Sequence, residues 1–237
     1  KEVYRLTGQK EKFEDIMENH INYMWEEYEL TYSLSDDAIL LIEFDGEKID
    51  PSKLGDALKK HIAFVSEDRR GAGLLLEESI EQNIVFTALQ VDNKFLKKFG
   101  ICKLYDKKAA EEHARNMIEQ LDIRCTGPEQ FAGRLSGGNQ QKVCLARAIT
   151  MQPKLLIVSE PTRGIDIGTK TEIQKLVVKL AQEGKSLIFI SSEIEEMLRT
   201  CNRMAVLRDG EKVGELTADE MSQEGVMHAI AGGGASE

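Results

Sequence analysis

Two short segments of this sequence combine residue types that could handle phosphate. The first reads LSGGNQQK over residues 135–142 and continues into the helical pattern VCLARAIT. Ser136 is a favourable helix N-cap, and the pair Gly137-Gly138 lets the backbone come close to a ligand. Backbone N–H groups and the partial positive charge at a helix N-terminus attract anions. The segment predicts an anion site built from backbone, although by itself it also fits a glycine turn that caps an ordinary helix.

The second segment reads LLIVSEPTRGIDIG over residues 155–168. Its apolar strand ends at Ser159-Glu160-Pro161, and in α/β sheets ligands bind beyond the carboxyl ends of the strands. Glu160 could accept a proton from an attacking water or polarise it. The alternative interpretation of Glu160 is a surface acid that follows a strand.

Alternating strand and helix patterns position both segments. Apolar or alternating runs predict strands at residues 2–6, 37–44, 62–65, 155–158, 187–190, 204–207 and 212–216. Helical patterns cover residues 9–28, 51–60, 78–89, 107–121, 137–151, 170–182 (with Gly184 as its C-cap), 193–200 and 219–230. The alternation predicts an α/β fold with a parallel sheet. Residues 78–150 show no convincing strand, and we expect a helical subdomain there.

LSGGNQQK followed by SEPTRGIDIG resembles the signature motif and the Walker B and D-loop segment of ABC-transporter ATPases. The likeness is closer to the second ATPase half of the tandem proteins that power importers of the ribose, galactose and xylose type. Three further segments are similar to that family: residues 62–83, 189–198 and 204–216. The resemblance covers roughly residues 60–232, and more weakly the first 60.

The resemblance implies a single nucleotide-binding domain over residues 1–237. Its fold would be α/β: an ABC-ATPase, RecA-like P-loop NTPase sheet core formed by residues 1–77 and 151–237. Residues 78–150 would form the inserted α-helical subdomain, and residues 231–237 a flexible tail.

The resemblance also implies roles for individual residues. In that family the signature motif contacts ATP that is held mainly by the opposite domain, so it serves a site in trans. The implied trans ATP-binding residues are Ser136, Gly137, Gly138, Asn139 and Gln140. The other implied site residues are Ser159 and Glu160 (Walker B, with Glu160 catalytic), Asp166 (D-loop), Ser192 (switch) and Glu67, Asp68 and Arg69 (Q-loop and coupling).

Two departures from the family pattern affect the domain's own, cis, nucleotide site. A P-loop, G-x-x-x-x-G-K-[ST], should follow the first strand, but residues 6–13 read LTGQKEKF. Gly184-Lys185-Ser186 lacks the first glycine of that motif and leads into a strand. Position 159 is serine where the family has an aspartate that holds Mg²⁺ through its water shell. These departures predict a degenerate Walker A site with weak binding of ATP and Mg²⁺.

The composition excludes several other classes of protein. Asp and Glu number 41 against 31 Lys and Arg, a net charge of −10, so no nucleic-acid partner is expected. No uninterrupted apolar run approaches the roughly 20 residues that span a bilayer. The four cysteines form no CxxC pair and the four histidines are scattered, which predicts reduced thiols and no metal site. Because the chain starts at Lys1 rather than Met, we interpret it as a fragment of a longer protein.

These features together predict an ATP-binding subunit, or half-subunit, of a monosaccharide ABC importer that couples ATP binding and hydrolysis to uptake. The implied cofactors are ATP and Mg²⁺. The implied partners are a second ABC ATPase domain, membrane permease subunits and, indirectly, a solute-binding protein, at the cytoplasmic face of a bacterial or archaeal membrane. Two alternatives remain open: a non-hydrolysing ABC-like regulatory domain, and a nucleoside importer ATPase. The sequence does not identify the solute.

Overall fold

The computed structural model describes residues 42–44, 47–49, 61–99 and 102–232, and the chain divides into two compact units, residues 1–59 and 60–237. In the first unit, β1 (Ile42–Phe44) and β2 (Glu47–Ile49) pair antiparallel, with Ile42 opposite Ile49. The predicted strand at 37–44 is confirmed for its last three residues. The strand predicted at 2–6 and the helices predicted at 9–28 and 51–60 lie outside the described residues.

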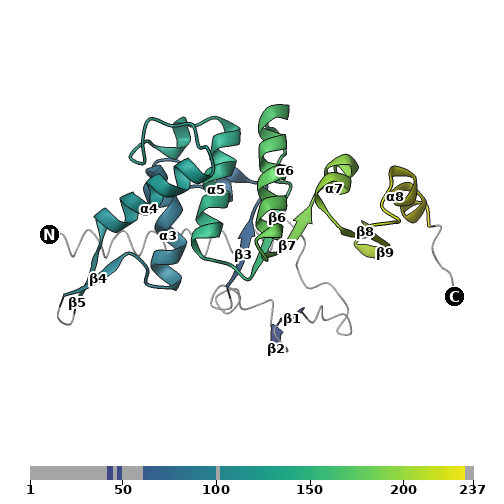
Figure 1. Ribbon diagram of the computed structural model, residues 1–237, viewed down its shortest axis with the longest axis horizontal. Helices are drawn as coiled ribbons and strands as arrows, with labels where there is room; N and C mark the ends of the chain where they lie inside the picture. Colours follow the sequence, from purple (N-terminus) through teal and green to yellow (C-terminus); the bar gives the residue numbers. More distant parts are fainter. Residues whose placement is uncertain (1–41, 45–46, 50–60, 100–101, 233–237) are drawn as a thin grey trace. The chain divides into compact units, whose positions relative to one another are not determined.

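A three-stranded parallel sheet forms the centre of the second unit (Figure 1). Its strands are β3 (Ile62–Val65), β6 (Leu155–Ser159) and β7 (Ser186–Ile190), in the order β3-β6-β7. Val65 lies opposite Val158, and Ser159 lies opposite Ile190, so the three strands end close to one line. The strands predicted at 62–65, 155–158 and 187–190 are confirmed, and the sheet is parallel as expected.

Helices pack on this sheet and on one another. They are α3 (Ile80–Val91), α4 (Lys107–Gln120), α5 (Gly137–Thr150) and α6 (Ile167–Gln182). The helix α5 packs against α3, β3 and α6, and α4 packs against α3 and α5. Their shared core joins buried residues of the helices to Ala63, Val65, Leu156 and Val158 of the sheet. Gly184, the residue after the C-cap Glu183 of α6, has a φ of +86°, a conformation that commonly ends a helix.

One expectation for residues 78–150 is wrong. The strands β4 (Leu96–Phe99) and β5 (Cys102–Tyr105) form an antiparallel hairpin between α3 and α4. Their sequences, LKKF and CKLY, are short and carry several lysines, so they lack the apolar run that marked the buried strands. The division into a sheet core and a helical subdomain stays a prediction.

The last part of the chain builds a second, smaller cluster. A bend after β7 leads into α7 (Ile194–Thr200), followed by β8 (Arg203–Arg208), β9 (Glu211–Thr217) and α8 (Gln223–Ile230). The strands β8 and β9 pair antiparallel because Asp209 and Gly210, both with positive φ, make a tight hairpin turn. Met204, Val206, Val226 and Ala229 form the buried centre of this cluster.

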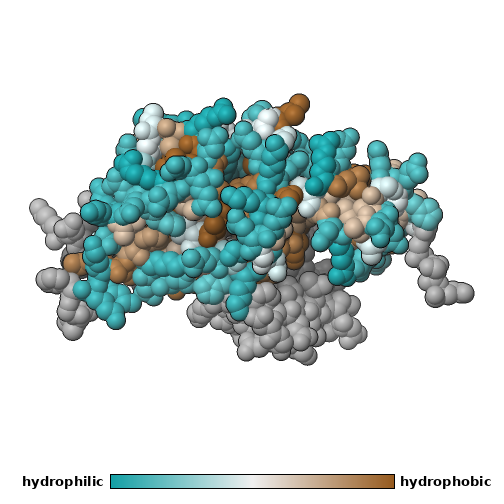
Figure 2. Space-filling model, viewed as in Figure 1, coloured by the Kyte–Doolittle hydropathy of each residue, from teal (hydrophilic) through white to brown (hydrophobic). Residues whose placement is uncertain are grey.

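The outer surface agrees with the acidic, charge-rich composition. Most of the face shown in Figure 2 is hydrophilic, and hydrophobic side chains appear on it in scattered patches. Among the described residues, no helix is both long enough and apolar enough to cross a membrane.

Candidate functional site

Several of the predicted site residues follow the carboxyl ends of the three parallel strands. Ser66, Glu67 and Asp68 come directly after β3, Glu160 comes after β6, and Ser192 comes two residues after β7. Because parallel strands end at the same edge of a sheet, the three loops meet there. The structure thus brings together residues that lie up to 126 positions apart in the chain.

The backbone of Glu160 adopts an uncommon conformation. Its φ is +42°, and its N–H donates to the carbonyl of Ile190 at 2.8 Å. A non-glycine residue with positive φ is strained, and such strain is concentrated at functional sites. The carboxylate Oε1 of Glu160 accepts the backbone N–H of Ser192 at 2.6 Å. The candidate catalytic acid and the predicted switch residue are therefore in direct contact.

A buried carboxylate, that of Glu196 in α7, joins the loop after β6 to the loop after β7. Its side chain is 3% exposed, and its Oε2 accepts the hydroxyl of Thr162 at 2.5 Å and that of Ser191 at 3.2 Å. The ammonium of Lys170 lies 3.4 Å from Oε1 and also pairs with Glu193. A buried charge is tolerated only when it is paired and hydrogen-bonded, and Glu196 meets both conditions.

The N-terminus of α5 has the geometry expected for the LSGGN segment. Ser136 is the N-cap, and its hydroxyl accepts the N–H of Asn139 at 3.5 Å. A Cβ at Gly138 would lie 2.4 Å from Cγ2 of Thr169 on α6, so glycine is required there for packing as well. Gly137 is partly exposed, and the first N–H groups of a helix point out from its end. The end of α5 therefore offers backbone donors to an anion.

The side chains of the next two residues are turned to their own chain. Asn139 Oδ1 accepts the N–H of Arg124 at 2.9 Å, and its Nδ2 donates to the Ser136 hydroxyl at 2.9 Å. Gln140 is 1% exposed, and its Nε2 donates to the carbonyl of Ala132 at 3.2 Å. These two residues hold the end of α5 in place, because the backbone N–H of Gln140 also donates to the carbonyl of Ser136 at 2.9 Å.

The loop after β3 reaches across to the loop after β6. Asp68 caps a single turn of π-helix, η1 (Arg69–Gly73), by accepting the N–H groups of Arg70 and Gly71. The guanidinium of Arg69 donates to the carbonyl of Arg163 at 2.7 Å, and that of Arg163 donates to Glu67 Oε2 at 2.8 Å.

Asp166 begins α6 as its N-cap. Its carboxylate accepts the N–H of Thr169 at 2.9 Å and the hydroxyl of the same residue at 2.8 Å. The bond from the Thr169 N–H, followed by that from its hydroxyl, lowers the pKa of Asp166 below its usual value. Next to it, Ile167 is 83% exposed, which is unusual for a large apolar side chain.

The end of β6 is a poor fit for Mg²⁺. Ser159 is 5% exposed and supplies a neutral hydroxyl rather than a carboxylate. Among the described residues, no group of three or more His, Cys, Asp or Glu side chains is placed to hold a metal ion. Mg²⁺ prefers carboxylate and phosphate oxygens, and we assign no step of the chemistry of this edge to a metal held by Ser159.

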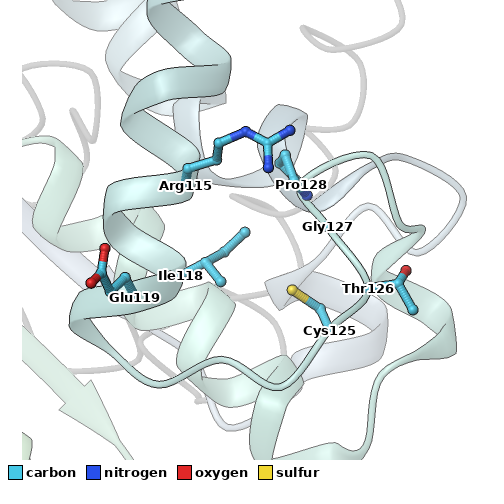
Figure 3. Close-up of a pocket in the computed structure, with 7 residues that line it drawn as sticks. All are labelled: Arg115, Ile118, Glu119, Cys125, Thr126, Gly127 and Pro128. Atoms are coloured by element: carbon cyan, nitrogen blue, oxygen red, sulfur yellow. The ribbon is translucent and has the colours of Figure 1, made fainter.

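A small open pocket lies away from these loops, between α4 and residues 125–128 (Figure 3). Cys125 lines it, and burial raises the pKa of this thiol. The Arg115 guanidinium at its rim pairs with Glu111 on the same helix. No predicted site residue lines this pocket, and it carries no functional assignment.

Sequence reasoning missed several residues of the site. Thr162, Lys170 and Glu196 join the loops after β6 and β7, and Arg163 joins those after β3 and β6. The acidic run Glu193, Glu195 and Glu196 gave no sign of which carboxylate would be buried. Only the fold brings Glu196 to Thr162, 34 positions away.

Comparisons with known proteins point to one family. The family model described as "ABC transporter" matches residues 33–163. The ribose import ATP-binding protein RbsA of Lactococcus lactis subsp. lactis is 41% identical over 192 residues, which are 81% of this chain and 38% of that protein. Ribose import ATP-binding protein RbsA 2 of Rhizobium meliloti is 38% identical over 180 residues, 76% of this chain and 34% of that protein. The chain thus spans less than two fifths of the length of these curated relatives.

The fold is also similar to that of solved ATP-binding cassettes. The cassette MJ0796, solved as a dimer in a post-hydrolysis state with ADP and phosphate, aligns with a TM-score of 0.60. The alignment covers 74% of this chain and 72% of the cassette at 21% identity. This likeness supports the predicted α/β fold of ABC-type P-loop NTPases.

Proposed function

This chain belongs to the ABC transporter family, and from that premise we propose that it is an ATPase unit, or half-unit, of a monosaccharide importer. The curated relatives named ribose import ATP-binding proteins support the solute class. The proposed cofactors are ATP and Mg²⁺, and the proposed partners are a second ABC ATPase domain and membrane permease subunits, with a solute-binding protein acting through the permease. The proposed location is the cytoplasmic face of a bacterial or archaeal membrane.

The N-terminus of α5 and the chain's own nucleotide site are proposed to have unequal roles. The end of α5 would complete an ATP site on the partner domain, with Ser136, Gly137 and Gly138 facing the terminal phosphate. The chain's own site would be degenerate, because its sequence lacks a P-loop and has Ser159 in place of an acid. Glu160 keeps the position of the catalytic carboxylate of that own site, and Asp166 would lie at the seam between the two domains.

The observation that carries this proposal is the N-terminus of α5. Ser136 caps the helix without charge, Asn139 donates to the Ser136 hydroxyl, and glycine at the first helical position leaves the backbone of Gly137 partly exposed to a ligand. An anion at such a helix end is stabilised by the N–H donors and by the helix dipole. No acidic residue stands in the first turn to repel it.

Replacing Ser136 by aspartate tests the trans role without disturbing the fold. Aspartate is as good an N-cap as serine, so α5 should stay intact, but its charge would repel a phosphate. We expect Ser136→Asp to lower the ATPase rate of the native importer complex by at least about 100-fold, the range seen when transition-state charge stabilisation is lost. The matched control is Ser136→Asn, which keeps the cap uncharged and should retain most of the activity. Full activity of the aspartate variant would refute the trans role.

Calorimetric titration of the chain alone with Mg²⁺-ATP tests the degenerate own site. We expect no binding at millimolar nucleotide, because no P-loop lysine is present to reach the phosphates. Saturable binding in the micromolar range would show that another segment has rebuilt the phosphate site. Residues 6–13 would then be the first to mutate.

The regulatory alternative predicts a different result. A non-hydrolysing domain would leave the ATPase rate of its complex unchanged in the Ser136→Asp variant. Ser159 favours this alternative, whereas the complete cap at the end of α5 disfavours it. A nucleoside importer ATPase would behave like a sugar importer in both assays, and only a transport assay with both solutes separates the two.

A further inference from the structure

Arg69 lies where three separate segments meet. It belongs to the loop after β3, and its Nη1 donates to the carbonyl of Arg163 in the loop after β6, at 2.7 Å and 94 positions away. Its Nη2 lies 3.4 Å from the position that a Cβ would take at Gly137, the first residue of α5. One side chain therefore contacts both the candidate anion site and the loop that leads to Asp166.

Two glycines make room for this guanidinium. A Cβ at Gly164 would lie 3.7 Å from Nη2 of Arg69, and Gly164 has a φ of +67° that other residues rarely adopt. The Nη2 atom of Arg69 thus lies close to the backbone at both Gly137 and Gly164. A planar, rigid guanidinium fits the space that these glycines leave, which a flexible ammonium would not fill in the same way.

A second hydrogen bond joins the same two loops, and its donor lies on the other loop. Arg163 donates to Glu67 at 2.8 Å, while Arg69 donates back to the carbonyl of Arg163. The loop after β3 is therefore tied to the loop after β6 twice, through one charged pair and one backbone carbonyl. The exposed ion pair alone would contribute little, because solvent screens it.

The position of Arg69 is not explained by local stability. A cation beside a helix N-terminus faces the positive end of the helix dipole. Its buried Nε also makes no hydrogen bond with the part of the chain that the structure describes, which is costly for a buried donor. Arg70, the next residue, is exposed and offers an internal comparison, because its side chain enters no hydrogen bond or ion pair within the described ranges.

We propose that Arg69 is a positioning residue, which holds the N-terminus of α5 and the loop after β6 at a fixed spacing. This inference rests on the proposed function, since it assigns the spacing to the ATP site that α5 would complete in trans.

Hydrogen–deuterium exchange of the full chain tests the positioning without any partner. We expect Arg69→Gln and Arg69→Lys to speed amide exchange in both residues 136–140 and residues 162–166 by about tenfold, because both segments lose a shared support. Arg70→Gln is the matched control and should leave both segments unchanged. Circular dichroism checks that each variant is folded. Unchanged exchange in either segment of the Arg69 variants would overturn the inference.

The ATPase rate of the native importer complex tests the consequence. If the planar guanidinium of Arg69 sets the spacing between α5 and the loop after β6, Arg69→Gln and Arg69→Lys should both lower kcat by about tenfold or more. The kcat of Arg70→Gln should stay within about twofold of wild type. A lysine variant with wild-type kcat would show that only charge is needed and would overturn the positioning role. Faster amide exchange in the Arg69 variants with an unchanged kcat would also overturn the positioning role, provided that Ser136→Asp inactivates the same complex.

The two proposals fail in distinguishable ways. If Ser136→Asp leaves the ATPase rate unchanged, the trans site itself is wrong. The exchange experiment then still decides whether Arg69 holds the two segments together, because it measures the chain alone.

Discussion

The N-termini of α5 and α6 are two loop-to-helix junctions of the same design with opposite electrostatic character. Each begins with a side chain that caps the helix, Ser136 in one and Asp166 in the other. The first is neutral and rich in glycine, and it offers backbone donors. The loop before the second carries Glu160 as well as Asp166, and both carboxylates are already bonded by N–H groups of the chain. The comparison teaches that two helix ends with the same capping bond differ in their attraction for an anion through the charge of the cap and of the loop before it.

The supports behind the two junctions differ as well. Behind the α6 junction, the buried Glu196 is bonded to Thr162 and paired with Lys170. At the α5 junction, Asn139 and Gln140 supply neutral hydrogen bonds, and the guanidinium of Arg69 lies beside Gly137. The α6 junction should therefore be sensitive to any change that leaves the buried charge unpaired, and the α5 junction should be sensitive mainly to changes of shape.

The largest expected effect is a loss of stability at the N-terminus of α6. Lys170→Met removes the cation from Glu196 and should lower the free energy of unfolding by about 3 kcal/mol, the usual cost of leaving a buried charge unpaired. The control is Lys179→Met on the same helix, whose exposed pair with Glu183 at 3.9 Å should be worth under about 0.5 kcal/mol. Urea denaturation measures both. Equal losses in the two variants would show that Glu196 does not need its cation.

At the N-terminus of α5, stability should depend mainly on how closely the helices pack. Gly138→Ala places a Cβ 2.4 Å from Cγ2 of Thr169 and should cost about 1–3 kcal/mol of stability by overpacking, despite the better helix propensity of alanine. Adding Thr169→Ala removes the clashing atoms and should restore most of the loss. A double variant no more stable than the single one in urea denaturation would place the strain elsewhere.

The two caps should differ in their pH dependence. Ser136→Ala should cost about 1 kcal/mol at every pH, because a hydroxyl cap does not titrate. The pKa of Asp166 is lowered in the folded chain, chiefly by the Thr169 N–H. Its stabilising contribution is therefore present above the unfolded pKa near 3.8 and is lost as the pH falls through the lower folded value. Thermal unfolding of Asp166→Ala and wild type should converge at low pH, while the gap for Ser136→Ala should stay constant.

The smallest expected effect is that of replacing Glu160 on the ATPase rate. If the chain's own site is silent, Glu160→Gln should leave the ATPase rate of the native complex within about twofold of wild type, because no nucleotide there depends on that carboxylate. The amide can still accept the N–H of Ser192, so the fold is preserved. A loss as large as that expected for Ser136→Asp would show that both junctions work in hydrolysis, and the unequal assignment would be wrong.

The sequence was a good guide wherever the signal was local. Two glycines after a serine predicted the cap of α5, and apolar runs that end in small or acidic residues predicted β6 and β7, because caps and buried strands depend on neighbours in the chain. The hairpin of β4 and β5 was missed, since four-residue strands rich in lysine show no such run. Contact of Gln140 with ATP stays a prediction, and the inward packing of its side chain, which depends on the position of Ala132, gave no local signal.

The sequence by itself determined the family and the strand ends that carry Glu160 and Ser192, because these are matters of residue type and spacing. The degenerate Walker A site stays a prediction. Only the tertiary structure decided which acid is buried, why Gly138 must lack a side chain, and that Arg69 reaches both α5 and the loop after β6. Those facts depend on contacts between residues 31 to 94 positions apart. Such contacts arise only when parallel strands end side by side, and no local pattern in the chain records them.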